Sequence, residues 1–156
     1  MRQLNLQITG SLSTRVDARR LARAVRAVLL AEEVKCPVGL TVAVVDDAEM
    51  EQLHVTYRGE PGTTDVLSFP FEPLSGGEEE EYEYLGDVVI AWPQAARQAG
   101  EEGHTPQDEV DLLVVHGVLH LLGYDDEVPE ARARMWARQA HIMEQLGLGH
   151  VAPKGQ

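Results

Sequence analysis

The sequence is poor in cysteine, in aromatic residues and in positive charge. Its 156 residues include one cysteine, Cys36, so an internal disulfide is excluded and nothing in the fold requires an oxidising compartment. The apolar runs are too short to cross a bilayer, and the N-terminal MRQLNLQITG alternates apolar and polar residues where a signal peptide has an apolar block. These absences predict a cytoplasmic protein with no membrane partner.

The charge is strongly negative, with 13 Lys and Arg against 26 Asp and Glu, a net of −13. That balance argues against broad, non-specific nucleic-acid binding, which depends on neutralising phosphates, but leaves room for a local basic groove. An acidic run over residues 78–83 is typical of a solvated loop. Five arginines between residues 15 and 26 are spread along a predicted helix, and we interpret them as a solvated face and not as an RNA-binding stripe.

Hydrophobic periodicity predicts four strands, at residues 4–8, 39–47, 64–72 and 84–92. Ser13 or Thr14 can cap a first helix, and a short second helix starts at Asp46 or Asp47 and stops at Gly59. Pro70 places the third strand at a sheet edge or ends it early, and the last two strands are expected to pair as a hairpin around the acidic loop.

The last third of the chain is predicted to be helical, with helices that begin at Pro93, at Thr105 or Pro106, and at Pro129. The sequence shows no internal repeat, no linker and no sign of a second domain. We therefore expect an α+β fold in one domain, residues 1–156, in which helices pack on a small mixed sheet of about four strands.

The stretch HGVLHLLGYDD, residues 116–126, combines two histidines four apart on a helix, a glycine and two aspartates. His116 and His120 point within about 40° of each other, so both imidazoles can reach one ion. Gly117 lets this helix approach a neighbour, and Gly123 ends it, so that Tyr124, Asp125 or Asp126 can return towards the imidazoles. This layout predicts an open zinc site.

The competing interpretation places the two histidines on an ordinary amphipathic face beside a core stripe. Zincin peptidases have a glutamate base directly after the first histidine, where this chain has Gly117, which counts against an ordinary metalloprotease. Trp92 and Trp136 are interpreted as packing residues. The remaining histidines are interpreted as ordinary surface or helix residues: His54, His104, His141 and His150.

Three segments in order resemble the YbeY family of bacterial endoribonucleases and rRNA maturation factors. They are YRGEPGTTDVLSFPFE at 57–72, LGDVVIAWPQAARQA at 85–99 and HGVLHLLGYDD at 116–126. The resemblance implies a cytoplasmic protein with one zinc-type ion that acts on single-stranded RNA, in maturation of the 3′ end of 16S rRNA on the small ribosomal subunit and in ribosome quality control. It implies that His116 and His120 are metal ligands and that Arg58 supports catalysis.

The third ligand departs from the family pattern, because Asp126 stands where the family has a histidine. A carboxylate binds zinc at a similar distance, but its charge should lower the acidity of the ion and of its bound water. Asp126 as ligand is the favoured assignment; the alternatives are Asp125 or another nearby group, or a weakened site.

The leading hypothesis is a metal-dependent endoribonuclease in which Zn²⁺ is held by His116, His120 and Asp126 and Arg58 contacts the phosphate. Thr64, Asp65 and Ser68 could line its cleft, but Thr64 and Asp65 equally suit a turn that enters a strand. The two alternatives are a metallopeptidase-like hydrolase and a ribosome-assembly factor whose metal is mainly structural.

Overall fold

The computed structural model describes residues 3–59, 64–71 and 83–151, with the side chain of Arg58 excepted. Four strands form one mixed sheet in the order β1-β2-β4-β3. They are β1 (Gln3–Ile8), β2 (Val38–Val45), β3 (Val66–Pro70) and β4 (Glu83–Ala91). β1 and β4 both run parallel to β2, whereas β3 pairs with β4 in the antiparallel sense. The predicted α+β class and four-stranded mixed sheet are confirmed.

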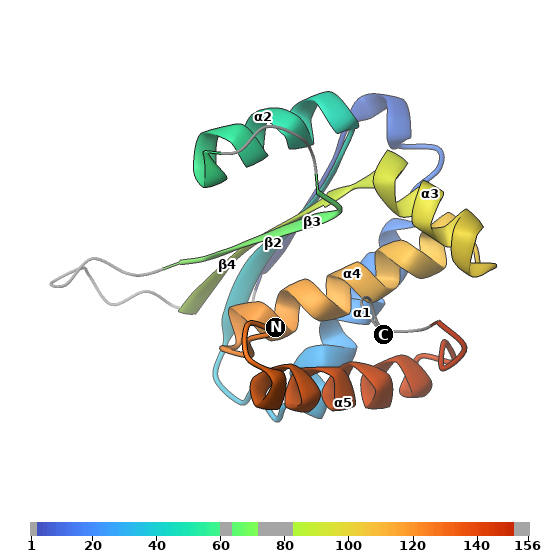
Figure 1. Cartoon of the computed structure of the whole chain (residues 1–156). Helices are drawn as coiled ribbons and strands as arrows, with labels where there is room; N and C mark the ends of the chain where they lie inside the picture. The colour runs from blue at the N-terminus through green and yellow to red at the C-terminus, as the bar shows by residue number, and fades with distance from the viewer. Residues whose placement is uncertain (1–2, 60–63, 72–82, 152–156) are drawn as a thin grey trace, which may run out of the picture.

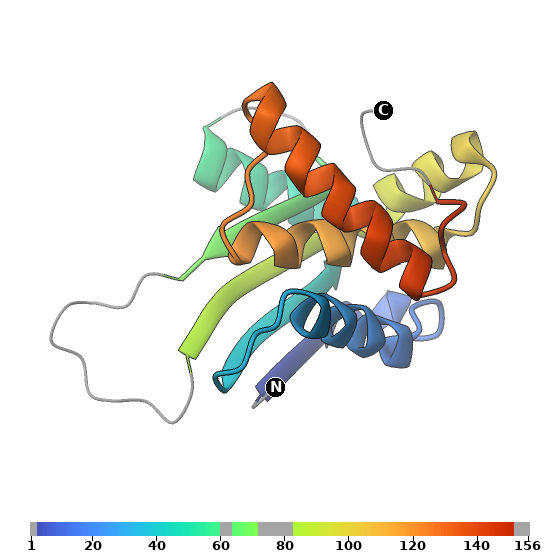
Figure 2. The same ribbon diagram turned by 90° about the horizontal axis from the view of Figure 1, so that it is seen from below.

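Five α-helices cover the two faces of this sheet unequally. They are α1 (Ala18–Ala31), α2 (Asp47–Arg58), α3 (Trp92–Glu102), α4 (Pro106–Leu121) and α5 (Pro129–Gln145). Figure 1 shows α2 alone on one face and α1 and α4 on the other, with α5 outside them. Seen from below in Figure 2, α5 crosses over α4 and so encloses it on the side away from the sheet. Within the described residues, no helix is both long and apolar enough to cross a membrane.

Side chains of the strands alternate between the two faces. Along β2, Val38, Leu40, Val42 and Val44 enter the large core under α1 and α4, while Val45 enters the smaller cluster beneath α2. The larger cluster holds most of the buried apolar residues, including those of α4, and therefore positions this helix.

The predicted hairpin and its edge strand are confirmed. β3 lies at the edge of the sheet and ends at Pro70, which removes one N–H donor where no further strand needs it. The acidic residues Glu78 to Glu81, predicted as a solvated loop, lie outside the described residues.

The predicted cap of the first helix is wrong. Residues Gly10–Leu12 form a 3-10 turn, and Ser13 donates its hydroxyl back to the carbonyl of Gly10. The helix starts only after Asp17, whose carboxylate accepts the backbone N–H groups of Arg19 and Arg20.

Helix α4 is buried on all sides, which the predicted one-sided core stripe did not anticipate. Every residue from Asp108 to Leu119 is buried, because the sheet, α1, α3 and α5 each contact this helix. Its polar side chains therefore need partners inside the protein. The helix begins at Pro106, within the predicted start, and Thr105 caps it: Thr105 and Asp108 exchange side-chain and backbone hydrogen bonds.

Two arginines of α1 bind residues of the helical layer. Arg20 contacts Asp108 at 2.8 Å and Asp111 at 2.6 Å, and Arg23 donates to the carbonyl of Leu146 at 2.9 Å. These contacts tie α1 to α4 and to the end of α5. They support the interpretation that this arginine-rich helix is not an RNA-binding stripe, although Arg20 and Arg23 bind protein groups and are not simply solvated.

His104 corrects another prediction. It was interpreted as an ordinary surface or helix residue, yet its side chain is only 3% exposed, with Nε2 lying 3.1 Å from the Glu109 carboxylate. Glu109 also accepts from the amide of Gln98 at 3.3 Å, and Gln98 donates to Asp65 at 3.2 Å. Because α4 is buried all round, Glu109 draws this histidine inward as its partner.

Candidate metal centre

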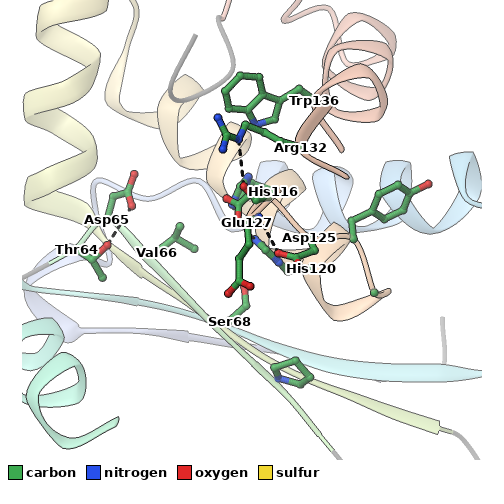
Figure 3. Close-up of a pocket in the computed structure, with 14 residues that line it drawn as sticks. Thr64, Asp65, Val66, Ser68, His116, His120, Asp125, Glu127, Arg132 and Trp136 are labelled. Carbon is green, nitrogen blue, oxygen red and sulfur yellow. Dashed lines mark hydrogen bonds and ion pairs between the residues drawn. The ribbon is translucent and has the colours of Figure 1, made fainter. Parts of the chain in front are cut away.

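His116 and His120 lie at the C-terminal end of α4, one turn apart. Their ring centroids are 4.7 Å from each other, and the ring planes are inclined by 74°. Both side chains line a cavity of about 730 Å³ (Figure 3). The predicted convergence of the two imidazoles is therefore present in the fold.

Gly117 brings this part of α4 against the sheet, as predicted. A Cβ at this position would lie 2.5 Å from Cγ1 of Val88 on β4 and 3.2 Å from Oγ of Ser68 on β3. A Cβ essentially never approaches another atom as closely as 2.5 Å, and 3.2 Å is already tight, so a larger residue would force Val88 or the helix itself to move. The glycine thereby places β3 beside the two histidines.

The chain turns back towards the histidines directly after α4. Gly123 adopts φ +104°, a conformation that side-chain-bearing residues rarely take, and the turn brings Asp126 over the imidazoles. Oδ2 of Asp126 lies 3.8 Å from Nε2 of His116, and Oδ1 of Asp126 lies 3.8 Å from Nε2 of His120. One ligand atom from each of these three residues lies within 4.8 Å of the others.

The spacing and chemistry of this triad fit a zinc ion. Ligands held tetrahedrally at about 2.0–2.1 Å from zinc lie roughly 3.3 Å apart. The two His–Asp126 separations of 3.8 Å therefore need to shrink by about 0.5 Å, and a pair of ligand atoms at the 4.8 Å limit of the group by about 1.5 Å. Two imidazole nitrogens and one carboxylate oxygen form a common catalytic donor set, which leaves a fourth position open for water or substrate.

The side chain of Asp125, the alternative third ligand, binds a backbone group of the turn. Its Oδ1 accepts the backbone N–H of Glu127 at 3.0 Å. In the described part of the chain, the residues grouped closely enough to hold an ion are His116, His120 and Asp126. The geometry therefore favours Asp126 over Asp125.

Gln139 contacts His116, and this contact was not predicted from the sequence. It lies on α5, is fully buried, and its Oε1 is 2.5 Å from Nδ1 of His116. Because an amide oxygen only accepts, Nδ1 of His116 must carry the proton, which leaves the Nε2 lone pair directed towards His120 and Asp126. The available signal was a glutamine at a core position of α5, between Met135 and Ile142.

Burial also controls the charge of His116. Removal from water, followed by repulsion from His120, lowers the pKa of His116 below its ordinary value. His116 is therefore neutral at physiological pH, which is the form that binds a metal ion.

The cavity around the triad has two walls. Residues 64–70 on and before β3 form the first wall, which contains the predicted Thr64, Asp65 and Ser68. Arg132 and Trp136 of α5 form part of the second. Trp92 is buried in the core as predicted, whereas Trp136 packs partly against the core and also lines the cavity.

Arg58, the predicted catalytic arginine, is the last residue of α2. Gly59 follows it in the left-handed conformation, with φ +69°, and ends the helix as expected. The Arg58 side chain lies outside the described part of the structure, so its predicted role stays a prediction.

Comparison with known proteins identifies the family. A family model described as "Endoribonuclease YbeY" matches residues 6–147. The chain belongs to the YbeY family. Endoribonuclease YbeY of Thermobifida fusca is 43% identical, with 90% of this chain and 92% of that protein covered. Endoribonuclease YbeY of Pelotomaculum thermopropionicum is 47% identical, with 82% and 85% covered.

The solution structure of TM1509 from Thermotoga maritima has the same fold, with a TM-score of 0.59 and 22% sequence identity over 98% of this chain and 99% of that one. The YbeY match includes both walls of the cavity and all three residues of the triad. The resemblance noted from three sequence segments is therefore confirmed over most of the chain.

Proposed function

We propose that this protein is a metal-dependent endoribonuclease that cleaves single-stranded RNA, with one Zn²⁺ per chain held by His116, His120 and Asp126. The observation that carries the proposal is the convergence of these three ligand atoms in an open cavity. Membership of a family whose relatives are named endoribonucleases supplies the substrate class.

The residues of the site have separate tasks in this proposal. Gln139 holds His116 in the tautomer that presents Nε2, and the turn at Gly123 presents Asp126. A bound zinc ion would polarise a phosphoryl oxygen and acidify a coordinated water. Asp126 adds a negative charge that a third imidazole would lack, and this charge raises the pKa of such a water. Arg58 is proposed to contact the phosphate and stabilise negative charge in the transition state.

The physiological substrate is proposed to be rRNA on the small ribosomal subunit, where the protein matures the 3′ end of 16S rRNA and takes part in ribosome quality control. Support comes from the relationship to the YbeY family. Small subunits that carry an unprocessed 3′ end provide the test substrate. The mature end should form with wild-type protein and not with His120→Ala.

A cleavage assay tests the proposed activity and its metal dependence. Labelled single-stranded RNA should be cut by zinc-loaded protein, and cutting should stop with chelator and in His120→Ala. His141→Ala is the matched control and should retain full activity, because His141 is exposed on α5 and belongs neither to the triad nor to the described lining of the cavity. A folded, zinc-free protein that cleaves RNA at the wild-type rate would contradict the proposal.

The same preparations distinguish the alternatives. A metallopeptidase-like hydrolase would cut an unstructured peptide in a reaction lost in His116→Ala. An assembly factor with a mainly structural metal would lose thermal stability on chelation, and its folded His120→Ala variant would still support rRNA processing. Gly117 occupies the position where a zincin has its glutamate base, so peptide cleavage is not expected.

A further inference from the structure

The second wall of the cavity contains a cation that the proposed activity has not yet used. Arg132 and Trp136 lie four residues apart on α5, on one face of the helix, and both line the cavity that holds the triad. Figure 3 shows Arg132 between Trp136 and the histidines.

Two contacts hold the Arg132 side chain in place. Its Nε donates to the backbone carbonyl of Asp126 at 3.1 Å, and its Cζ lies 5.7 Å from the centroid of the Trp136 ring. A guanidinium supported by an aromatic ring is already ordered, so it loses little side-chain entropy when it binds an anion. The Nε contact leaves both terminal nitrogens, with four N–H donors, for such a ligand.

The charge around Arg132 indicates what that ligand is. Besides Asp126, the cavity is lined by the carboxylates of Asp65, Asp125 and Glu127, which repel a polyanion. Arg132 is the one lysine or arginine among the described lining residues, and no ion pair with another described residue engages it. By contrast, Arg138 on the same helix is paired with Glu32 at 2.7 Å.

We propose that Arg132, supported by Trp136, binds a phosphate group of the RNA strand next to the phosphodiester that is cut. The inference rests on the proposed ribonuclease function. A guanidinium can contact a phosphate through two parallel N–H donors, which fixes both the position and the orientation of the strand beside the triad. The bond to the Asp126 carbonyl places this phosphate-binding group directly beside the proposed third ligand.

RNA binding and its salt dependence test the proposal. Zinc-loaded protein is titrated with a labelled 2′-O-methylated single-stranded oligonucleotide, whose integrity is checked on a gel, at several salt concentrations. Arg132→Gln should weaken binding about tenfold, the order expected for one charge-assisted contact. It should also reduce the slope of log affinity against log salt by about 0.7, the value for one phosphate contact to a single strand. Inorganic phosphate should compete only at much higher concentration than the oligonucleotide.

Two further variants separate charge from structure. Arg134→Gln removes an exposed arginine two residues away on α5 and should change neither the affinity nor the slope. Arg132→Lys keeps the positive charge and should retain the wild-type slope, with an affinity between those of wild type and Arg132→Gln. A residue that only braced the Asp126 turn would lower zinc affinity in both Arg132 variants and leave the salt slope unchanged.

The outcomes distinguish this inference from the proposed function. Wild-type protein that neither binds nor cuts RNA would overturn the ribonuclease proposal and this inference with it. Wild-type protein that binds and cuts RNA, with Arg132→Gln equal to Arg134→Gln in affinity and slope, would overturn the role of Arg132 alone.

Discussion

Replacing Gln139 with leucine should separate metal binding from folding. The change removes the acceptor that Nδ1 of His116 contacts at 2.5 Å, while it keeps a side chain of similar size in a fully buried position. We expect the metal-free variant to fold with nearly wild-type stability and to bind zinc much more weakly.

The expected stability follows from two opposing terms. Leaving the buried N–H of His116 without an acceptor costs about 1–3 kcal/mol. However, Nε2 of Gln139 is itself buried without a partner among the described residues, and its removal relieves a penalty of the same order, about 1–3 kcal/mol. The free energy of unfolding of the metal-free protein should therefore change by no more than about 1 kcal/mol.

In Gln139→Leu, no second effect offsets the expected loss of zinc affinity. Loss of a partner that orients a metal-binding histidine typically costs about 10–100-fold in affinity, or about 1.4–2.7 kcal/mol. At saturating zinc, the stabilisation of the folded protein by the ion should fall by the same amount.

The assay is a zinc competition titration with a chromophoric chelator, run beside denaturant unfolding with and without zinc. Gln139→Glu retains an oxygen acceptor and should bind zinc at least as tightly as wild type. Gln145→Leu makes the same chemical change at an exposed position of α5 and serves as the control. If Gln139→Leu bound zinc as tightly as Gln145→Leu, the reasoning about the His116 tautomer would be refuted.

The other predictions concern the third ligand, the helix contact and the arginine. Asp126→Ala should lose zinc affinity in a competition titration, whereas Asp126→His and Asp125→Ala should retain it; a reversal between the two alanine variants would reassign the ligand. Gly117→Ala should lower the free energy of unfolding by about 1–3 kcal/mol in denaturant titration, since crowding outweighs the roughly 1 kcal/mol that alanine gains in a helix. Arg58→Ala should greatly reduce RNA cleavage while its melting temperature stays near wild type; equal losses would make Arg58 structural.

Local sequence signals predicted much of the site. Two histidines at helical spacing and a glycine turn are features of a single stretch of chain, and the turn at Gly123 is formed as expected. Pro70 likewise predicted the edge strand, because proline has no backbone N–H to donate to a further neighbouring strand.

Other features depended on packing between distant segments. Gln139 is 23 residues from His116, and only the packing of α5 on α4 brings them together. The His104 side chain is buried because it pairs with Glu109 of the enclosed helix α4, and the pattern of one helix does not reveal that enclosure. The caps predicted for the first helix were Ser13 and Thr14, but the 3-10 turn at Gly10–Leu12 delays the start of the helix, and Asp17 caps it instead.

The most direct test of the account is a titration of chelator-stripped protein with zinc, followed by cleavage of labelled single-stranded RNA. Activity should be absent without metal, rise in proportion to added zinc and reach its plateau at one ion per chain, while His116→Ala stays inactive at the same zinc concentrations. Full cleavage by the stripped protein, or by folded His116→Ala, would contradict the assignment of a catalytic metal to this triad.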